Sequence, residues 1–332
     1  MKKKILSIVS LLTLPGLVLA ACGGAQTEPA GSAAIKVLAS TTFLADIAQN
    51  IAGDRAQVES LLPAGADPHA YQEAPTDVAK IAESSVLILN GMEYEHFIEP
   101  LLENAGGQRL VIEATAGLTP HEMEEHTAEG EEHAHEAGDP HMWLDPNLVI
   151  TYVENIRDGL SDADPEGAET YKANADAYIA QLQELDAFIK DQVESVPAER
   201  RLLVTNHEAL GYFAERYGFE VVDTIIPSLS TEANASAQEV AAAIEAIKAT
   251  GAPAIFLGEV ENADLANQIA DETGVKVVNS LYLETLTDGE PAATYIDMMR
   301  FNVTQIVDGL KYLSCNSPRQ GVCSSLLSVV RV

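Results

Sequence analysis

The sequence is poor in basic residues, in aromatic residues and in cysteine. Its 332 residues hold 19 Lys and Arg against 51 Asp and Glu, a formal net charge of −32. Because so acidic a chain repels phosphate groups, we expect neither nucleic acid nor anionic lipid as a partner. Aromatic residues make up 5% of the chain and hydrophobic residues 47%. We therefore expect a globular body of aliphatic helices rather than an aromatic-lined sugar site.

Several motifs of enzymes and metal sites are also absent. The three cysteines form no Cys-x-x-Cys pair and have no zinc-finger spacing with histidine, which argues against a thiolate metal site. No Gly-x-Ser-x-Gly motif or phosphate-binding loop is present. The segment His121–His126 has one residue too many for the His-Glu-x-x-His motif of zinc proteases. We therefore do not expect an enzyme, and a zinc hydrolase is the main alternative.

The first 34 residues have the pattern of an export signal followed by a tether. Three lysines at 2–4 precede the apolar run Ile5–Ala20, which is rather short for a permanent membrane span. Leu19-Ala20-Ala21-Cys22 then has the form of a lipoprotein cleavage box. We expect residues 1–21 to be removed, Cys22 to be lipidated and residues 22–34 to form a flexible tether. The alternative is a plain signal peptide with an incidental cysteine. Either reading predicts an exported protein, at the outer face of the cytoplasmic membrane or in the periplasm.

The two remaining cysteines, Cys315 and Cys323, lie in the tail at residues 313–332. In an oxidising compartment an even pair of this kind can form a disulfide. The tail itself indicates no function.

Short apolar runs alternate with helical patterns in two regions, residues 35–163 and 197–312. In the first region, strands are expected at Ile35–Ala39, Val58–Leu62, Val86–Asn90 and Leu110–Glu113. In the second region, they are expected at Leu202–Thr205, Glu220–Thr224, Ala254–Leu257 and Val275–Val278. This alternation predicts an α/β fold with parallel sheets.

Residues 164–196 separate the two regions and predict one long helix. Asp164–Val193 is rich in Ala, Glu, Gln, Leu and Lys, and Leu182, Leu185 and Ile189 recur at helical spacing before Pro197. At about 1.5 Å per residue, roughly 28 to 30 residues span about 40 Å. We therefore expect two α/β lobes, each with a mainly parallel sheet flanked by helices, joined by this helix.

Residues 121–136 have a composition that cannot build a core. They hold seven glutamates and four histidines, namely His121, His126, His133 and His135. We expect a mobile loop that binds metal weakly, through changing sets of imidazoles. The alternative is a solvated surface loop without a role.

Four separate stretches carry residues that suit a metal ion. They are Gly65–Tyr71, Asp139–Pro146, Thr205–Glu208 and Ser280–Glu284. Three of them follow expected strands directly, at the edge where open α/β sheets bind ligands. His69, His141, His207 and Glu284 would supply three imidazoles and one carboxylate, a set suited to four-coordinate zinc. Two ligands would come from each lobe.

The chain resembles the zinc/manganese solute-binding proteins of bacterial ABC importers. The matching stretches are Ala39–Phe43, Ile51–Asp54, Gly65–His69, Asp139–Pro146, Thr205–Ala209 and Thr294–Arg300. The Asp-Pro-His-x-Trp element and the Tyr-x-x-Met-Met segment are its most specific parts. The likeness runs from about Ile35 to Leu310, nearly the whole body expected after cleavage.

The resemblance implies two α/β lobes joined by a long helix, with metal held between them. It implies His69, His141 and His207 as ligands. The family's fourth ligand is usually an aspartate; here Glu284 falls closest and Asp288 is its rival. The histidine-rich loop favours Zn2+, with Mn2+ as the alternative. We expect a monomer that binds a divalent metal and delivers it to the membrane permease of an ABC importer. A surface adhesin is the other alternative.

Overall fold

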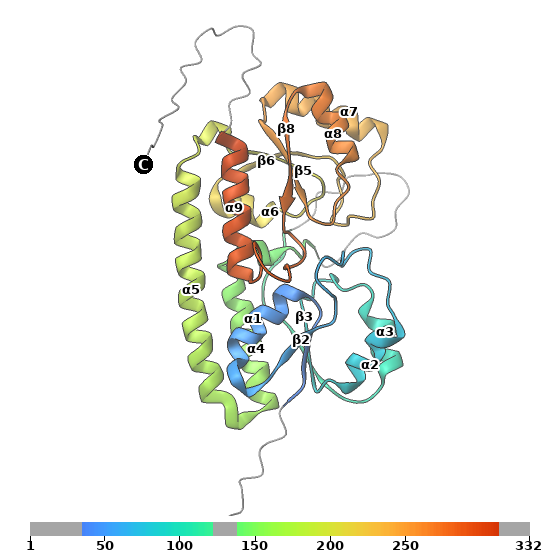
Figure 1. Ribbon diagram of the computed structural model, residues 1–332, viewed down its shortest axis with the longest axis vertical. Helices are drawn as coiled ribbons and strands as arrows, with labels where there is room; N and C mark the ends of the chain where they lie inside the picture. The colour runs from blue at the N-terminus through green and yellow to red at the C-terminus, as the bar shows by residue number, and fades with distance from the viewer. Residues whose placement is uncertain (1–34, 122–137, 312–332) are drawn as a thin grey trace, which may run out of the picture. The chain divides into compact units, whose positions relative to one another are not determined.

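The computed structural model describes residues 35–121 and 138–311, which form two four-stranded parallel sheets (Figure 1). The strands of the first sheet are β1 (Val37–Ala39), β2 (Val58–Ser60), β3 (Val86–Leu89) and β4 (Leu110–Glu113). The strands of the second sheet are β5 (Leu202–Thr205), β6 (Glu220–Thr224), β7 (Ala254–Gly258) and β8 (Lys276–Leu281). The predicted strands therefore exist, with ends that differ by up to three residues.

The two sheets share one topology. The strand order is β2-β1-β3-β4 in the first and β6-β5-β7-β8 in the second, and neighbouring strands are parallel in both sheets. The inner strands β1, β3 and β7 are buried throughout, as apolar strands covered on both faces must be. β1 thus corresponds to β5, β2 to β6, β3 to β7 and β4 to β8.

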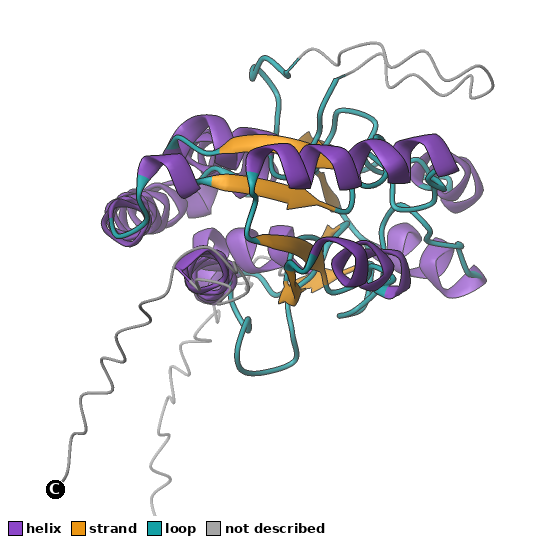
Figure 2. Cartoon of the chain, turned by 90° about the horizontal axis from the view of Figure 1, so that it is seen from above, coloured by secondary structure: helices purple, strands orange, loops and turns teal. Residues whose placement is uncertain are grey.

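Helices flank the strands of both sheets (Figure 2). In the first half and the connection they are α1 (Thr42–Ala52), α2 (Pro75–Glu83), α3 (Ile98–Ala105), α4 (Leu148–Ala163) and α5 (Ala168–Glu194). In the second half they are α6 (Gly211–Tyr217), α7 (Ala237–Thr250), α8 (Asp264–Thr273) and α9 (Tyr295–Lys311). Short 3-10 helices occupy Gly53–Arg55, Met142–Leu144, Pro165–Gly167 and Ala198–Arg200.

The long helix α5 joins the two halves, as the sequence predicts. It contacts α1 and α4 of the first half and α6 and α9 of the second. It begins at Ala168, four residues later than predicted. Pro165 starts a 3-10 turn, and the Asp164 carboxylate accepts hydrogen bonds from Arg55 and Tyr171 instead of entering the helix. The two-lobe α/β fold is therefore confirmed, with a slightly shorter connecting helix.

One glycine in each half lets a helix lie close against its sheet. A methyl group at Gly159 of α4 would lie 2.3 Å from Cδ1 of Ile112 in β4. A methyl group at Gly309 of α9 would lie 2.8 Å from the Phe256 ring in β7. Ile112 and Phe256 belong to one apolar core that also includes the buried face of α5. The core is therefore continuous from one sheet to the other.

Several predictions fall on residues outside those described. These are the signal and tether at 1–34 with Cys22, the loop histidines His126, His133 and His135, and the tail with Cys315 and Cys323. Among the described helices, none has the length and apolar character needed to cross a membrane. The exact domain boundaries stay a prediction.

Candidate metal centre

Four side chains that sequence analysis singled out lie together. His69, His141, His207 and Glu284 are buried, and one potential ligand atom from each lies within 4.8 Å of the others. The three imidazole centroids are 5.3 to 5.8 Å apart. Asp288, the rival for the fourth position, is not in this group and lines a hollow of about 330 Å³ with Asp46.

The facing atoms of these side chains have no hydrogen-bond partner among the described residues. They are Nε2 of His69, His141 and His207, and Oε1 of Glu284. Oε1 lies 3.6 Å from Nε2 of His141 and 3.3 Å from Nε2 of His207. Four donors about 2.0 to 2.2 Å from one zinc ion would lie about 3.4 Å from each other in a tetrahedron. Because unpaired buried polar atoms cost free energy, four that converge at these separations suit a shared cation.

The topology explains why the four residues meet. His69 lies in the loop after β2, and His141 precedes the 3-10 helix that leads into α4. His207 follows β5 and Glu284 follows β8. The carboxyl edges of the two sheets thus supply the cluster, as expected for ligand sites in open α/β sheets.

The two first-half histidines are held by the same local turn. In each Asp-Pro-His sequence, the aspartate Oδ1 accepts a hydrogen bond from the histidine backbone N–H, at 3.0 Å from Asp67 to His69 and 2.9 Å from Asp139 to His141. Asp139 Oδ1 also lies 2.8 Å from Nδ1 of His141, which leaves Nε2 to face the cluster. His69 has no such partner for Nδ1 among the described side chains. The turn chemistry of Asp-Pro therefore holds the backbone of both histidines, and in His141 it also orients the ring.

His207 is oriented by Glu261, 54 residues further along the chain. Nδ1 of His207 hydrogen-bonds to Oε1 of Glu261, and the other Glu261 oxygen accepts the Gly258 N–H at 2.6 Å. Burial disfavours the charged imidazole, but the hydrogen bond to Glu261 and the negative charges of Glu261 and Glu284 outweigh it and raise the pKa of His207 to about 10. The pKa of His141 is also raised, because the hydrogen bond to Asp139 and the negative charge of Glu284 outweigh burial.

Glu284 is fixed by contacts to both of its oxygens and to its backbone. Burial would raise the pKa of this carboxyl, but the surrounding imidazoles hold it well below its ordinary value. The Tyr94 hydroxyl donates to Oε2 at 2.6 Å, so only Oε1 faces the histidines without a partner. The Glu284 N–H donates to Oε1 of Glu259 at 3.1 Å. Burial raises the pKa of Glu259 to about 7.

Sequence analysis missed Tyr94, Glu259 and Glu261. A signal was available, because Glu259 and Glu261 directly follow β7 at the edge that carries the other site residues. The segment Gly258-Glu259-Val260-Glu261 contains no histidine or cysteine, so it did not stand out as a metal site.

Of the loop histidines, only His121 lies within the described residues, and it stands apart from the cluster. Its ring stacks on Tyr212 with centroids 3.9 Å apart. Its Nε2 lies 2.6 Å from Oε2 of Glu215, a carboxylate of α6 that is largely exposed. His121 thus packs at the base of the loop on the second half, and weak metal binding by the loop stays a prediction.

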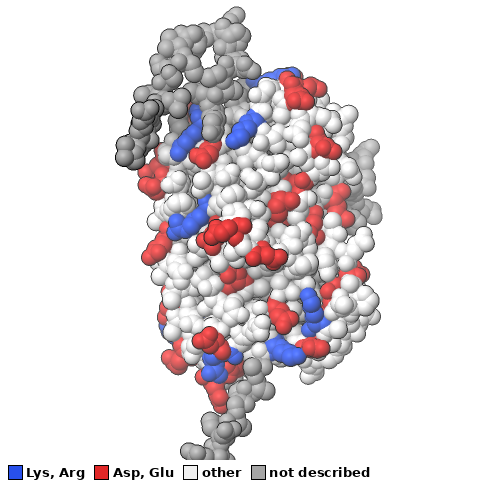
Figure 3. All heavy atoms as spheres, viewed as in Figure 1, with Lys and Arg blue, Asp and Glu red and all other residues white. Residues whose placement is uncertain are grey.

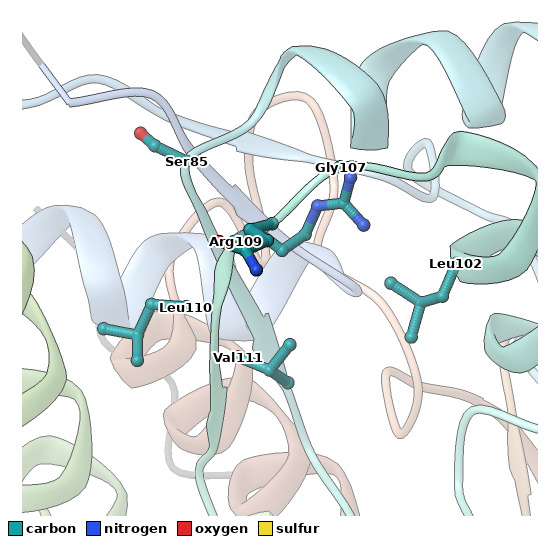
Figure 4. Close-up of a pocket in the computed structure, with 7 residues that line it drawn as sticks. Ser85, Leu102, Gly107, Arg109, Leu110 and Val111 are labelled. Atoms are coloured by element: carbon teal, nitrogen blue, oxygen red, sulfur yellow. The ribbon is translucent and has the colours of Figure 1, made fainter.

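The surface around these residues also bears on cation binding. In the middle of the face in Figure 3, acidic side chains are scattered among uncharged ones and outnumber the basic ones. A larger hollow of about 730 Å³ lies at the outer edge of the first sheet, lined by Ser85, Leu102, Arg109, Leu110 and Val111 (Figure 4). It offers no imidazole or carboxylate. The buried cluster is therefore the better candidate for a metal site.

Comparisons with known proteins show the family to which the chain belongs. Residues 37–309 match the family model described as zinc-uptake complex component A, periplasmic. The chain is 34% identical over 312 residues to the manganese-binding lipoprotein MntA of Halalkalibacterium halodurans, covering 93% of this chain and 99% of the relative. It is 34% identical over 287 residues to the iron-binding protein YfeA of Yersinia pestis, covering 86% and 89%.

Solved structures give the same picture. The Mn-bound periplasmic metal binding protein from Candidatus Liberibacter asiaticus is similar with a TM-score of 0.73 and 31% identity, covering 83% of this chain and 99% of that one. The periplasmic zinc binding protein TroA from Treponema pallidum is similar with a TM-score of 0.73 and 29% identity, over the same shares. The names of these relatives thus include manganese, iron and zinc.

Proposed function

The chain belongs to the zinc-uptake component A family of metal-binding proteins of ABC importers, and we propose that it captures a divalent transition metal outside the cytoplasmic membrane for delivery to an importer permease. The metal is cargo rather than a resident cofactor. We propose His69, His141, His207 and Glu284 as its ligands.

One observation carries the ligand assignment. Three imidazole nitrogens and one carboxylate oxygen are buried, face each other and have no other partner within the described residues. Hydrogen bonds hold the far sides of His141, His207 and Glu284, so their free atoms are preorganised. Outer partners of this kind fix ring orientation and raise the basicity of the ligands.

We propose zinc as the preferred cargo and manganese as the second candidate. Three nitrogens and one oxygen suit zinc, whereas manganese prefers a larger shell rich in oxygen. The relatives' names support manganese equally, because they include manganese-binding, iron-binding and zinc-binding proteins. Competition between the two ions for the purified protein decides between them.

Transport suits this site better than hydrolysis. A catalytic zinc keeps an open position for water beside a general base. Here four buried donors converge, and the carboxylates of Asp139 and Glu261 are engaged by imidazole Nδ1 atoms. The adhesin alternative stays a separate prediction, tested by whether metal-free protein binds a host surface unchanged.

Calorimetric titration with Zn2+ and Mn2+ tests the proposal. We expect one tight site in the wild type, and a loss of more than about a hundredfold in affinity for His141→Ala or His207→Ala, because each removes one of four ligands. His121→Ala is the matched control, since its ring lies outside the cluster. Unchanged affinity in His141→Ala would show that the metal binds elsewhere.

The lipid anchor is proposed from the sequence Leu19-Ala20-Ala21-Cys22 after the apolar run. A Cys22→Ser variant should be released from the membrane fraction while keeping its metal affinity. Recovery of the variant in that fraction would contradict the anchor without touching the proposed ligands.

A further inference from the structure

We propose that Glu259 is a positioning residue that keeps the bound metal four-coordinate and so sets its selectivity. This inference rests on the proposed function, because it concerns how Glu284 presents its carboxylate to the metal. Glu259 itself does not face the three histidines. It acts through the loop that follows β8.

The Glu259 carboxylate holds three successive backbone N–H groups of that loop. Oε2 accepts from Leu283 N at 2.7 Å, and Oε1 accepts from Glu284 N at 3.1 Å and from Thr285 N at 2.8 Å. Leu283, Glu284 and Thr285 are all at most 3% exposed, so water cannot easily replace these bonds.

The first half holds the same loop from the other side. Trp143 Nε1 donates to the Leu283 carbonyl at 2.8 Å, and Thr42 Oγ1 accepts the Leu286 N–H at 2.8 Å. Tyr94 occupies Oε2 of Glu284. Glu259 is thus a second-half side chain that opposes these first-half contacts and holds the Glu284 backbone directly, while Asn302 holds the backbone of Tyr282, two residues earlier.

This arrangement limits Glu284 to one ligand oxygen. With its backbone held by Glu259 and Oε2 held by Tyr94, the side chain presents Oε1 alone to the histidines. Three imidazoles and one oxygen complete a zinc shell, while manganese requires further oxygen ligands. If the loop were released, the carboxylate could turn to bind through both oxygens, and water could enter.

Cobalt absorption tests this assignment, because four-coordinate Co2+ absorbs visible light far more intensely than five- or six-coordinate Co2+. We expect intense bands in the wild type and weaker bands in Glu259→Ala. Zinc affinity should fall roughly 10- to 100-fold, as for other outer partners of metal ligands. Manganese affinity should fall less, so the zinc-to-manganese ratio decreases.

Two further variants keep the test sharp. Glu259→Gln retains one acceptor oxygen, so its bands and its ratio should lie between those of the wild type and Glu259→Ala; it also serves if the alanine variant does not fold. Ile247→Val, in the second-half core away from the loop, controls for a general loss of stability and should keep the wild-type bands.

The outcomes separate the two proposals. Equal losses of both affinities with unchanged cobalt bands in the Glu259 variants would overturn the positioning role, as would altered bands in Ile247→Val. A wild type that binds none of the three ions tightly would instead overturn the proposed function.

Discussion

In each half a glutamate after the third strand accepts a hydrogen bond from a residue that follows the first strand, but only in the second half is that residue one of the proposed metal ligands. In the second half, Glu261 after β7 bonds to His207 after β5. In the first half, Glu95 after β3 accepts a hydrogen bond at 2.6 Å from Ser40, the residue after β1. Each glutamate also accepts a backbone N–H from the end of its own strand. The first-half glutamate thus holds a serine hydroxyl, whereas the second-half glutamate holds the imidazole of a proposed ligand.

The halves also hold their ligands over different distances along the chain. Asp139 supports His141 from two residues away, whereas Glu261 supports His207 from 54 residues away. In the first half, a local turn therefore positions His141. In the second half, the position of the His207 ring depends on the tertiary fold. Changes that weaken packing in the second half should affect the site more than similar changes in the first.

The largest expected effect concerns pH and the long-range pair. His207, with its pKa raised to about 10, holds a proton at neutral pH in the metal-free protein, and the metal must displace it. Zinc affinity should therefore rise about tenfold per pH unit for this proton, or about a hundredfold from about pH 6 to about pH 8. Titration calorimetry at several pH values measures this.

Glu261→Gln sharpens that prediction. Without the carboxylate, the pKa of His207 should fall, and the pH dependence of zinc affinity should flatten by one proton. The same pKa also affects folding: in the metal-free wild type, the raised pKa of His207 contributes to the free energy of unfolding below pH 6.5, and this contribution is lost as the pH rises through about 10. Parallel pH profiles for the variant and the wild type would rule out this role for Glu261.

Next in size, the two close-packed glycines should differ in tolerance. Gly309→Ala places a methyl group against Phe256 in the inner strand β7, and we expect a loss of about 2 kcal/mol in the free energy of unfolding. Gly159→Ala meets Ile112 on the edge strand β4, which can shift, so its loss should be smaller. Denaturant unfolding measures both, and the reverse order would contradict the comparison.

A smaller effect separates the two local turns. Asp139→Asn keeps an acceptor for the His141 N–H but removes the charge beside Nδ1, and zinc affinity should fall about tenfold. Asp67→Asn should cost less, because Asp67 bonds to the backbone N–H of His69 and to Thr231 but not to the imidazole of His69. Equal losses in the two variants would mean that the charge on Asp139 does not matter.

The smallest predicted effect concerns a bond between the halves. Thr231 Oγ1 donates to Oδ2 of Asp67 at 2.6 Å, which ties the loop after β6 to the His69 turn. Thr231→Val should speed metal release to a chelator about fivefold, as expected for one lost hydrogen bond. Thr304→Val is the matched control, because its hydroxyl bonds only to the carbonyl of Arg300 in its own helix. Stopped-flow mixing with chelator measures the rates. Equal rates in wild type and Thr231→Val would show that this hydrogen bond does not slow metal release.

Much of the fold could be predicted because its signals are local. The bounds of β4, β5 and β6 agree with the sequence pattern residue for residue. His69 and His141 stand out because Asp-Pro precedes each of them. Tyr94, Glu259 and Glu261 were missed because their partners lie 190, 24 to 26 and 54 residues away, and no local pattern records such contacts.

The helix α5 has a mechanical consequence. Two bodies joined by extended strands can rotate about a few backbone torsions, but a continuous helix of 27 residues bends only if its ladder of backbone hydrogen bonds is broken or stretched. Because α5 is packed along helices of both halves, it resists bending and does not act as a hinge. Wide opening of the halves is therefore costly. We therefore expect metal to exchange through short-range motions of loops such as the one that carries Glu284. The rate of exchange would then depend on the stability of these loops and not on a movement of whole halves.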